Sequence, residues 1–520
     1  MRSVLSTVLL AGLVASLPLR AEPSVVIALD PSKPGPKIDR HIFGQFAEHL
    51  GAGIYGGIWV GPESSIPNTR GIRNDVVAAL KAIHVPVVRW PGGCFADEYH
   101  WRNGIGPANA RRATLNPNWG GVIESNAFGT HEFMDFADQI GADAYVSINV
   151  GSGTVQEAAE WMEYMTTDQP SALGKERAAN GHPAPYKVPY LGIGNESWGC
   201  GGLMTPSDYT GKLKIFGHFV HNFNTKVPTA QIAVGPNDGK TEYTEAVMST
   251  WKENRGWAFD LGGLSMHSYT IGGWPPHWKG SGFGEDDYAT VLRETLRMEP
   301  YLRSHSAIMD KYDPDKKVSL VVDEWGTWLA ATPGTNPAFL AQENSLRDAI
   351  VAAININIFA RHADRVRMTN IAQMINVLQA MILTDQEKML LTPTYHVFKM
   401  YLPFQDATLV PVSFDTGPYQ HGDINLPRID AIAAKTRDGA FAVAVVNVDP
   451  SKPAVVTLDV PGSGAQRAVG QTLTAARSDA VNTFAAPNTV APKPVETRVK
   501  GGKLTLTLAP QSITVLVLEH

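Results

Sequence analysis

The chain has 520 residues, of which 44% are hydrophobic and 18% are charged, which is an ordinary globular composition. This length exceeds what a single hydrophobic core usually serves, so we expect two domains. A net charge of −6 without any basic block argues against nucleic acid as a partner.

The N-terminal segment, residues 1–21, predicts a secretory signal peptide. Arg2 supplies the positive charge, residues 8–17 form a short apolar run, and Ala21 is a small residue at the expected cleavage point. Leu19 departs from the small residue expected two positions before that point. The run is too short to span a bilayer and no later segment reaches the ~20 apolar residues required, so no membrane partner is expected. The sequence therefore predicts an exported protein, periplasmic or secreted, cleaved near Ala21.

Short apolar runs alternate with amphipathic segments along residues 39–390, which is typical of strand–helix units in a parallel sheet. The expected strands are 42–47, 85–90, 144–150, 190–194, 232–235, 264–267, 318–322 and 366–373. Segments with helical spacing include 73–84, 131–141, 154–166, 208–222 and 345–362. Eight strands with helices between them predict an α/β fold, a (β/α)₈ TIM barrel. The last strand has an alternative, because 368–383 also fits a helix.

Residues 391–520 have a different character. Stretches 440–448, 454–460 and 504–518 are rich in β-branched residues that alternate with polar ones, and they are separated by Gly, Pro and Asp turns. No convincing helix interrupts them. This pattern predicts a C-terminal antiparallel β-sandwich, jelly-roll-like. The segment 22–38 contains a short extended run at 24–30, which we expect to add a strand to the sandwich.

Polar side chains stand at the carboxyl end of nearly every expected barrel strand. In chain order they are Glu48 and His49, Arg89, Asn149, Asn195 and Glu196, Asn237, His267 and Tyr269, Glu324, and Gln373. One such residue alone is typical of a loop cap. Their recurrence at all eight strands is typical of the active-site face of a barrel enzyme.

Glu196 and Glu324 form the pair that carries the chemistry. Hydrolysis of a glycosidic bond needs two carboxyl groups, one to protonate the leaving oxygen and one to attack the sugar or to activate water. One of them must stay protonated near neutral pH while the other is charged, so their surroundings must differ. The sequence predicts a glycosidase.

Five strings make this prediction specific: FGQFAEHL (43–50), VRWPGG (88–93), GNE (194–196), MHSY (266–269) and DEW (323–325). In their order and spacing they resemble glycoside hydrolase family 51, the α-L-arabinofuranosidases. The resemblance covers nearly the whole chain after residue 21.

The resemblance implies a role for each matching residue. Glu196 corresponds to the general acid/base and Glu324 to the nucleophile. Asn195 is expected to bind the 2-hydroxyl of the sugar, while Arg89 and Tyr269 are expected to hold Glu324 ionised and oriented. His267 is expected to line the site, and Glu48 and Gln373 to bind hydroxyls of the terminal furanose. No cofactor or metal is implied.

Cys94 departs from the family pattern, in which Asn follows the two glycines and contacts a sugar hydroxyl. Cys94 is kept as a substrate-binding candidate, although a thiol is a weak donor and acceptor. Cys200 lies on the same face, so the two cysteines could pair in an oxidising compartment. Two free buried thiols are the favoured reading, because disulfide geometry is demanding. No close Cys/His spacing suggests a metal site.

The function implied is an exo-acting retaining α-L-arabinofuranosidase. It would release arabinofuranose from arabinoxylan, arabinan or their oligosaccharides, the expected partners, and the chain could form a homo-oligomer. Two alternatives were weighed: an endo-β-glucanase on the same barrel, and a non-catalytic carbohydrate-binding protein. The intact pair Glu196 and Glu324 argues against the second, because a binding protein does not need a paired acid and nucleophile.

Overall fold

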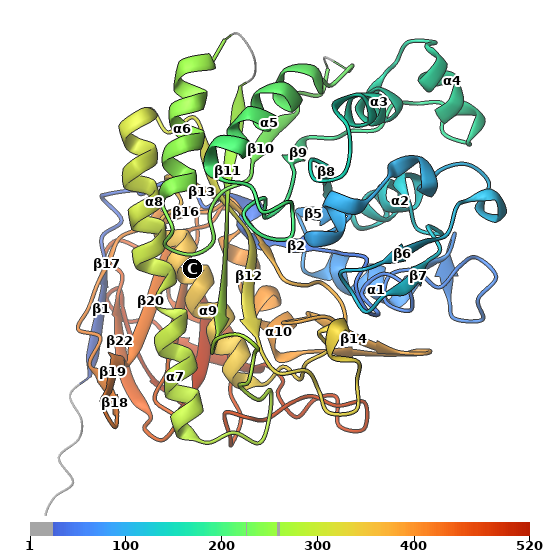
Figure 1. The fold of residues 1–520 in the computed structure, drawn as a ribbon. Helices are drawn as coiled ribbons and strands as arrows, with labels where there is room; N and C mark the ends of the chain where they lie inside the picture. The colour runs from blue at the N-terminus through green and yellow to red at the C-terminus, as the bar shows by residue number, and fades with distance from the viewer. Residues whose placement is uncertain (1–23, 225, 257–259) are drawn as a thin grey trace, which may run out of the picture.

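The computed structural model describes residues 24–224, 226–256 and 260–520 (Figure 1). The predicted signal peptide, residues 1–21, lies outside the described residues. Within those ranges, none of the helices combines the length and hydropathy needed to cross a membrane.

Eight parallel strands form a closed barrel, which confirms the predicted TIM-barrel architecture. The barrel closes where the last strand pairs with the first, at Asn370 opposite Gly44. Residues 368–371 belong to this closing strand, so the helical alternative for 368–383 is wrong. Around the barrel the strands are β2 (Gly44–Phe46), β5 (Val87–Trp90), β8 (Asp143–Ile148), β9 (Tyr190–Ile193), β10 (Ala230–Ala233), β11 (Leu261–Ile271), β12 (Ser319–Trp328) and β13 (Val366–Ile371).

Helices connect the strands and cover the outside of the barrel (Figure 1). One of them, α9, is buried along almost its entire length, because it lies between the barrel and the C-terminal sheets. It begins with a capping box, in which Ser345 and Asp348 satisfy each other's backbone amides. The helices are α1 (Asn74–Ala82), α2 (Thr130–Ile140), α3 (Val155–Thr166), α4 (Ala172–Ala179), α5 (Pro206–Phe219), α6 (Glu242–Asn254), α7 (Glu285–Thr295), α8 (Met298–Tyr312) and α9 (Leu346–Arg361).

The C-terminal part contains two sheets with their own apolar core. The N-terminal strand β1 belongs to the first of them, where it pairs antiparallel with β17 and parallel with β22. The other pairings described within the two sheets are antiparallel. The first sheet has the order β17 (Val412–Ser413), β1 (Val25–Leu29), β22 (Ala454–Asp459), β25 (Lys503–Leu508); the second has β16 (Thr408–Val410), β20 (Ile429–Lys435), β21 (Phe441–Asn447), β26 (Ser512–Glu519), β23 (Arg467–Leu473), β24 (Lys493–Arg498).

A helix that the sequence analysis did not predict, α10 (Pro393–Met400), precedes these sheets, so the absence of helix after residue 390 was wrongly expected. Thr392 caps it by accepting a hydrogen bond from the amide of Tyr395, and Pro393 occupies the first turn. Both are ordinary helix-start signals. The β-rich composition of the residues that follow had favoured the prediction that no helix occurs here.

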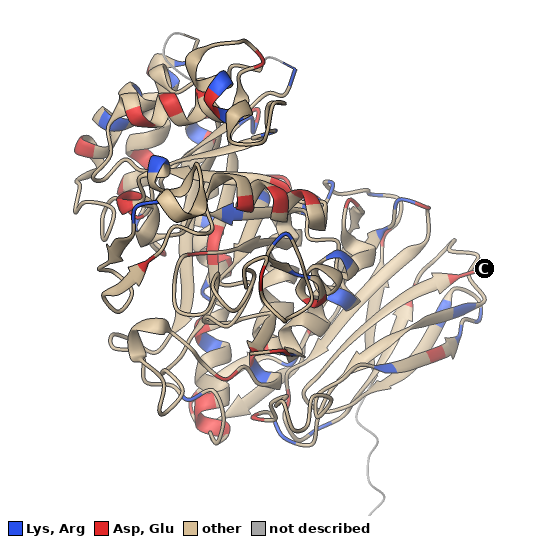
Figure 2. Ribbon diagram, turned by 90° about the vertical axis from the view of Figure 1, so that its right-hand side faces the viewer, with Lys and Arg blue, Asp and Glu red and all other residues tan. Residues whose placement is uncertain are grey.

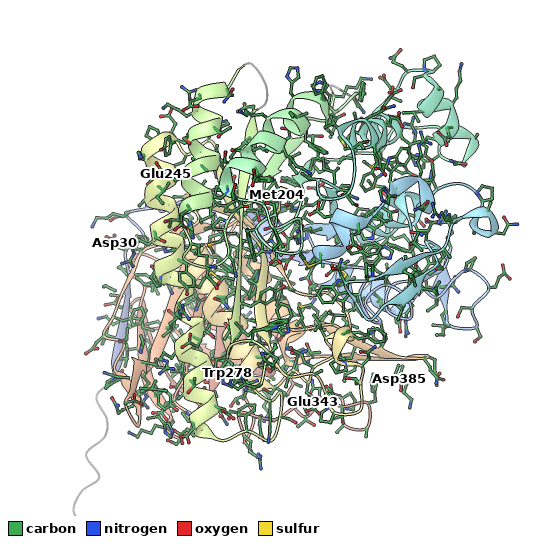
Figure 3. The ribbon with its side chains drawn as sticks, in the orientation of Figure 1. Asp30, Met204, Glu245, Trp278, Glu343 and Asp385 are labelled. Atoms are coloured by element: carbon green, nitrogen blue, oxygen red, sulfur yellow. A yellow bond between two sulfur atoms is a disulfide. The ribbon has the colours of Figure 1, made fainter. Side chains whose placement is uncertain are left out.

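Four short hairpins project from the barrel and the sandwich. Asp385 lies at the tip of one of them (Figure 3). The hairpins are β3 (Asn68–Thr69) with β4 (Ile72–Arg73), β6 (Thr114–Asn116) with β7 (Val122–Glu124), β14 (Ile382–Asp385) with β15 (Lys388–Leu391), and β18 (Pro418–His421) with β19 (Ile424–Pro427).

Charged residues of both signs are interspersed along the barrel helices, while the strands of the sandwich carry few (Figure 2). The inside of the barrel is apolar through its middle, where Val87, Tyr145, Ile232, Val321 and Met368 pack together. Polar side chains replace them toward the carboxyl ends of the strands. The polar side chains at the carboxyl ends of the strands are therefore supported by a rigid apolar interior.

Candidate active site

The barrel strands and the loops after them bring all nine predicted site residues to one end of the barrel. Six of them are linked by direct contacts, and Glu48, Gln373 and Cys94 are linked to these through Gly93 and Cys200, so the apolar barrel beneath fixes their positions. The nine are Glu48, Arg89, Cys94, Asn195, Glu196, His267, Tyr269, Glu324 and Gln373.

A β-bulge in β12 positions Glu324. Ser265 of β11 lies opposite Val321, but His267, two residues later, lies opposite Glu324, three residues later. The register with β13 also shifts in this part of β12. Because the extra residue interrupts the alternation of side chains, Asp323 and Glu324 both face the barrel interior. Successive side chains of a regular strand point to opposite faces, so the sequence alone does not predict two consecutive carboxylates on one face.

Glu324 is 6% exposed and is held by three donors. Its Oε1 accepts from Arg89 Nη1 at 2.7 Å, and its Oε2 accepts from the Tyr269 hydroxyl at 2.9 Å and lies 3.4 Å from His267 Nδ1. An opposite charge and donated hydrogen bonds both favour the ionised form of a carboxyl group. Glu324 therefore has the surroundings of a charged, oriented nucleophile.

Glu196 has different surroundings. Its side chain is 19% exposed, and burial is the main reason that its pKa is raised above the ordinary value. The single strong partner is His267, whose Nδ1 lies 2.8 Å from Oε1. The backbone of Glu196 is left-handed, with φ +33°, in the loop that follows β9. A carboxyl group with a raised pKa beside a second carboxyl group in different surroundings is the arrangement that acid/base chemistry requires.

His267 connects the two carboxyl groups. Burial alone would lower its pKa, but the charge of Glu324 and the hydrogen bonds with Asp323 and Glu196 outweigh burial and raise the pKa to about 10. His267 is therefore a cation at neutral pH. One oxygen of Glu196, one of Glu324 and a ring nitrogen of His267 lie within 4.8 Å of one another. The two carboxyl groups are therefore close neighbours, as in retaining glycosidases, where they stand about 5–5.5 Å apart.

Asn195 is fixed on both sides. Its Oδ1 accepts from Arg89 Nη2 at 2.6 Å, and its backbone amide donates to Asp97 Oδ2 at 2.8 Å. The Asp97 carboxylate also accepts the amides of Val150 and Gly151, so it ties the end of β8 to the end of β9. Sequence reasoning missed Asp97, because the residue lies inside a loop rather than at a strand end.

Glu48 accepts three hydrogen bonds through one oxygen. The amides of Gly93 and Phe95 donate to Oε1 at 3.0 and 3.1 Å, and Trp119 Nε1 donates at 3.0 Å. Oε2 accepts from Gln373 Nε2 at 3.0 Å. Burial, followed by the charge of Glu324, raises the pKa of Glu48 to about 7. Trp119, from the β6–β7 hairpin, was not predicted, because its strands are too short to leave a pattern.

The two glycines before Cys94 are needed for close approach. A methyl group on Gly92 would lie 2.6 Å from the Glu48 side chain, and one on Gly93 would lie 2.8 Å from Glu324 Oε1. Either contact is shorter than real packing permits, so the turn after β5 reaches both carboxylates only because these positions lack a side chain.

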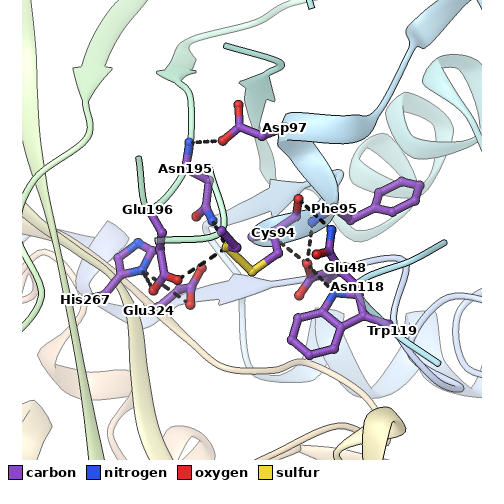
Figure 4. The surroundings of a disulfide bond; sticks show 12 residues. Glu48, Cys94, Phe95, Asp97, Asn118, Trp119, Asn195, Glu196, His267 and Glu324 are labelled. Atoms are coloured by element: carbon purple, nitrogen blue, oxygen red, sulfur yellow. Dashed lines mark hydrogen bonds and ion pairs between the residues drawn. A yellow bond between two sulfur atoms is a disulfide. The ribbon is translucent and has the colours of Figure 1, made fainter. Parts of the chain in front are cut away.

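Cys94 and Cys200 form a disulfide (Figure 4), so the expectation of two free thiols is wrong. The loops after β5 and β9 meet above the barrel, which brings the two α-carbons to 5.5 Å, within the range that a disulfide can bridge. Cys200 Sγ lies 3.6 Å from Glu196 Oε2 and 3.7 Å from Asn195 Nδ2. The bridge therefore lies against the pocket.

Within the described part of the chain, two groups of side chains have the proximity of metal ligands: Cys94, Glu196 and Cys200, and Glu196, His267 and Glu324. Neither donor set suits a metal. The sulfur atoms of a disulfide are not thiolates, and a cationic imidazole has no lone pair to donate.

The loops after β11 and β12 contact each other beside the cluster. The amide of Ala330 donates to the carbonyl of Trp278 at 2.9 Å. Trp328, at the end of β12, packs edge-on against Tyr269 with ring centroids 5.0 Å apart. Trp274 packs edge-on against Trp328 in turn and is largely exposed.

Comparisons with known proteins agree with this geometry. Residues 79–271 match the family model of the α-L-arabinofuranosidase 1 domain, and residues 323–512 match that of the α-L-arabinofuranosidase C-terminal domain. An intracellular exo-α-L-arabinofuranosidase from Bacteroides ovatus is 45% identical, over 98% of each chain.

Solved structures are similar over nearly the whole chain. A crystal structure of the GH51 arabinofuranosidase from Xanthomonas axonopodis pv. citri has a TM-score of 0.93 and 52% identity, covering 95% of this chain and all of that one. An α-L-arabinofuranosidase from Thermotoga maritima, solved as an arabinose complex, has a TM-score of 0.84 and 30% identity, covering 96% of this chain and all of that one.

The expectation of an exported, secreted protein with a signal peptide is contradicted by the Bacteroides ovatus relative, which is named as intracellular and aligns over 98% of this chain. A positive residue followed by a short apolar run is a weak pattern, because only the cleavage motif distinguishes a signal peptide from other apolar N-termini. Leu19 already departed from that motif.

Proposed function

Because this chain belongs to the α-L-arabinofuranosidases of glycoside hydrolase family 51, we propose that Glu324 and Glu196 carry out a double displacement with net retention at the anomeric carbon. The protein is an exo-acting α-L-arabinofuranosidase. The observation that carries the proposed mechanism is the separation of the two carboxyl groups, an oxygen of each within 4.8 Å of the other.

In the first step Glu196 gives its proton to the glycosidic oxygen while a Glu324 oxygen attacks the anomeric carbon. The bond from that carbon to the leaving oxygen breaks, and an ester between arabinose and Glu324 forms. In the second step Glu196, now a carboxylate, takes a proton from water. The water oxygen attacks the anomeric carbon, the ester bond breaks, and Glu324 is released as a carboxylate.

His267 supports both steps. As a cation between the two carboxyl groups it stabilises whichever of them is charged, first Glu324 and then Glu196. Arg89 and Tyr269 keep Glu324 in a single orientation, which places its attacking oxygen before the sugar arrives.

The sugar is held by Asn195, Glu48 and Gln373. Asn195 has its Oδ1 occupied by Arg89, which leaves its amide nitrogen for the 2-hydroxyl. Gln373 Oε1 is buried and has no hydrogen-bond partner among the described residues. A buried acceptor without a partner is costly, so a sugar hydroxyl that donates to it would bind favourably.

We infer that the substrates are arabinofuranosyl groups on arabinoxylan, arabinan or their oligosaccharides. The endo-β-glucanase alternative is disfavoured, because the relative at 45% identity is named an exo-acting enzyme. Homo-oligomerisation stays a prediction, which light scattering after size-exclusion chromatography tests. The division into a barrel at 39–390 and a sandwich at 391–520, to which 22–38 adds an N-terminal strand, is likewise proposed; limited proteolysis tests it.

The direct test is hydrolysis of 4-nitrophenyl α-L-arabinofuranoside beside 4-nitrophenyl β-cellobioside. The proposal expects release of nitrophenol from the first and none from the second. It also expects arabinose as the only small sugar released from arabinoxylan oligosaccharides. Cleavage of the cellobioside alone would overturn the proposal in favour of a glucanase.

A further inference from the structure

Asp323 is a second buried carboxylate, one residue before Glu324, and the mechanism above makes no use of it. It is 1% exposed, because the bulge in β12 turns it inward together with Glu324. The Tyr145 hydroxyl donates to its Oδ2 at 2.7 Å and the Ser265 hydroxyl to its Oδ1 at 2.5 Å. Taking a charge out of water costs several kcal/mol. A carboxylate buried at this position therefore needs interactions that offset its desolvation, or a function that explains why it is kept.

The two cations of the site both face this carboxylate. Arg89 Nε lies 3.4 Å from Oδ2, and His267 Nε2 lies 3.3 Å from Oδ1. Each of these side chains uses its other nitrogens on the catalytic carboxyl groups. Arg89 donates through Nη1 to Glu324, and His267 lies 2.8 Å from Glu196 through Nδ1. Asp323 thus touches neither the substrate position nor the reacting atoms. It contacts Arg89 and His267, and these two side chains contact the catalytic carboxyl groups.

The orientation of His267 depends on which groups surround its two ring nitrogens. Glu196 and Glu324 face Nδ1, whereas Asp323 faces Nε2. Asp238, in the loop after β10, is a further anion whose charge interacts with His267. Arg89 is the cation in the same cluster, and it is paired to Asp323 and Glu324. Among the described residues, Asp323 is the charged group that contacts Nε2, the nitrogen that points away from the catalytic pair.

We propose that Asp323 is a positioning residue that fixes Arg89 and His267, both in their charged forms, against the two catalytic carboxyl groups. The proposal rests on the proposed roles of Glu196 and Glu324. Without Asp323 the imidazole of His267 loses the anion beside its Nε2, and the guanidinium of Arg89 loses the anion beside its Nε. Glu324 would then lose its fixed orientation, and a displacement of about 1 Å at a reacting group costs roughly 100-fold in rate.

The test compares Asp323→Asn with Tyr145→Phe. The first variant keeps the size of the side chain and removes its charge, and the second removes one neutral hydrogen bond to the same carboxylate and keeps the charge. We expect Asp323→Asn to lower kcat on 4-nitrophenyl α-L-arabinofuranoside by roughly 100-fold while KM changes little. Tyr145→Phe should stay within a few-fold of the wild type.

The second readout is the titration of His267, followed by NMR of the protein with labelled histidine. It does not require activity, so its failure is distinguishable from failure of the proposed function. Wild-type His267 should remain charged up to about pH 10, and Asp323→Asn should bring the midpoint down. Tyr145→Phe should leave it in place.

The proposal is overturned if His267 titrates at the same pH in Asp323→Asn as in the wild type, or if kcat falls no further than in Tyr145→Phe. Should Asp323→Asn fail to fold, Asp323→Glu, which keeps the charge but displaces it, takes its place. A fall in kcat beyond that of Tyr145→Phe supports the proposal, and no such fall overturns it.

Discussion

Glu196 and Glu324 bring one carboxylate oxygen each to within 4.8 Å of the other, although their strands, β9 and β12, are separated around the barrel by β10 and β11. His267, from β11, lies between them and touches both. Glu324 is therefore held within a barrel strand, and Glu196 lies only three residues after the end of another. Burial raises the pKa of Glu196, whereas Arg89 and Tyr269 surround Glu324 with donors. Two identical side chains thus have different surroundings.

Glu324→Ala should lower kcat by roughly 10⁴-fold or more, because no other group can form the covalent intermediate. Added azide should restore turnover with an inverted arabinosyl azide as product, which NMR identifies. Glu98→Ala is a matched control, since this exposed glutamate lies on the loop after Cys94 outside the cluster. Residual activity near that of the wild type would remove Glu324 from its assigned role.

Glu196→Ala should be slow on substrates with poor leaving groups and much less impaired on activated aryl arabinofuranosides, whose departure needs no protonation. Azide should here give the product of retained configuration, the opposite of the Glu324 variant. The measurement is kcat/KM over a series of aryl leaving groups. An equal loss across the series would argue against Glu196 as the acid.

Glu48→Gln should change how stability depends on pH. Burial, followed by the charge of Glu324, raises the pKa of Glu48 from 4.5 to about 7, so the folded protein holds this proton more tightly than the unfolded chain. The stabilisation is fully present below about pH 4.5 and is lost as the pH rises through about 7. The free energy of unfolding of the wild type, relative to the variant, should fall across this window and then level off.

Chemical denaturation at a series of pH values measures this difference. Glu98→Gln serves as the control for the loss of an exposed carboxyl group. A flat difference for Glu48→Gln would show that Glu48 titrates alike in the folded and unfolded chain.

Reduction of the Cys94–Cys200 bridge should lower the thermal stability. The bridge joins residues 106 positions apart, and a cross-link over such a loop is worth about 2–4 kcal/mol. Cys94→Ser should show the same loss without reductant and no further loss with it. If reductant has no effect on the melting temperature of the wild type while free thiols become detectable, the bridge does not stabilise the fold.

The barrel could be predicted because each of its strands is a short buried run bounded by an amphipathic helix. The site residues followed, since parallel strands deliver their carboxyl ends to one face. His267 and Tyr269 lie within β11 and not after it, yet their spacing of two still places both on the pocket side.

What the sequence could not supply depends on contacts between distant segments. The extra residue in β12 is visible only against the register of β11, so Asp323 was not recognised as facing inward. Trp119 reaches Glu48 from a hairpin whose strands have three residues each. The bridge between Cys94 and Cys200 depends on where two loops meet, which no spacing in the sequence reveals.

The account is tested most directly by the configuration of the product that the wild-type enzyme forms with methanol as acceptor. Water and methanol attack the same intermediate, and the methyl arabinofuranoside keeps its anomeric configuration for NMR analysis. Double displacement through Glu324 predicts methyl α-L-arabinofuranoside, the configuration of the substrate. Methyl β-L-arabinofuranoside, or inverted arabinose with no transfer to methanol, would contradict the assignment of Glu324 as nucleophile.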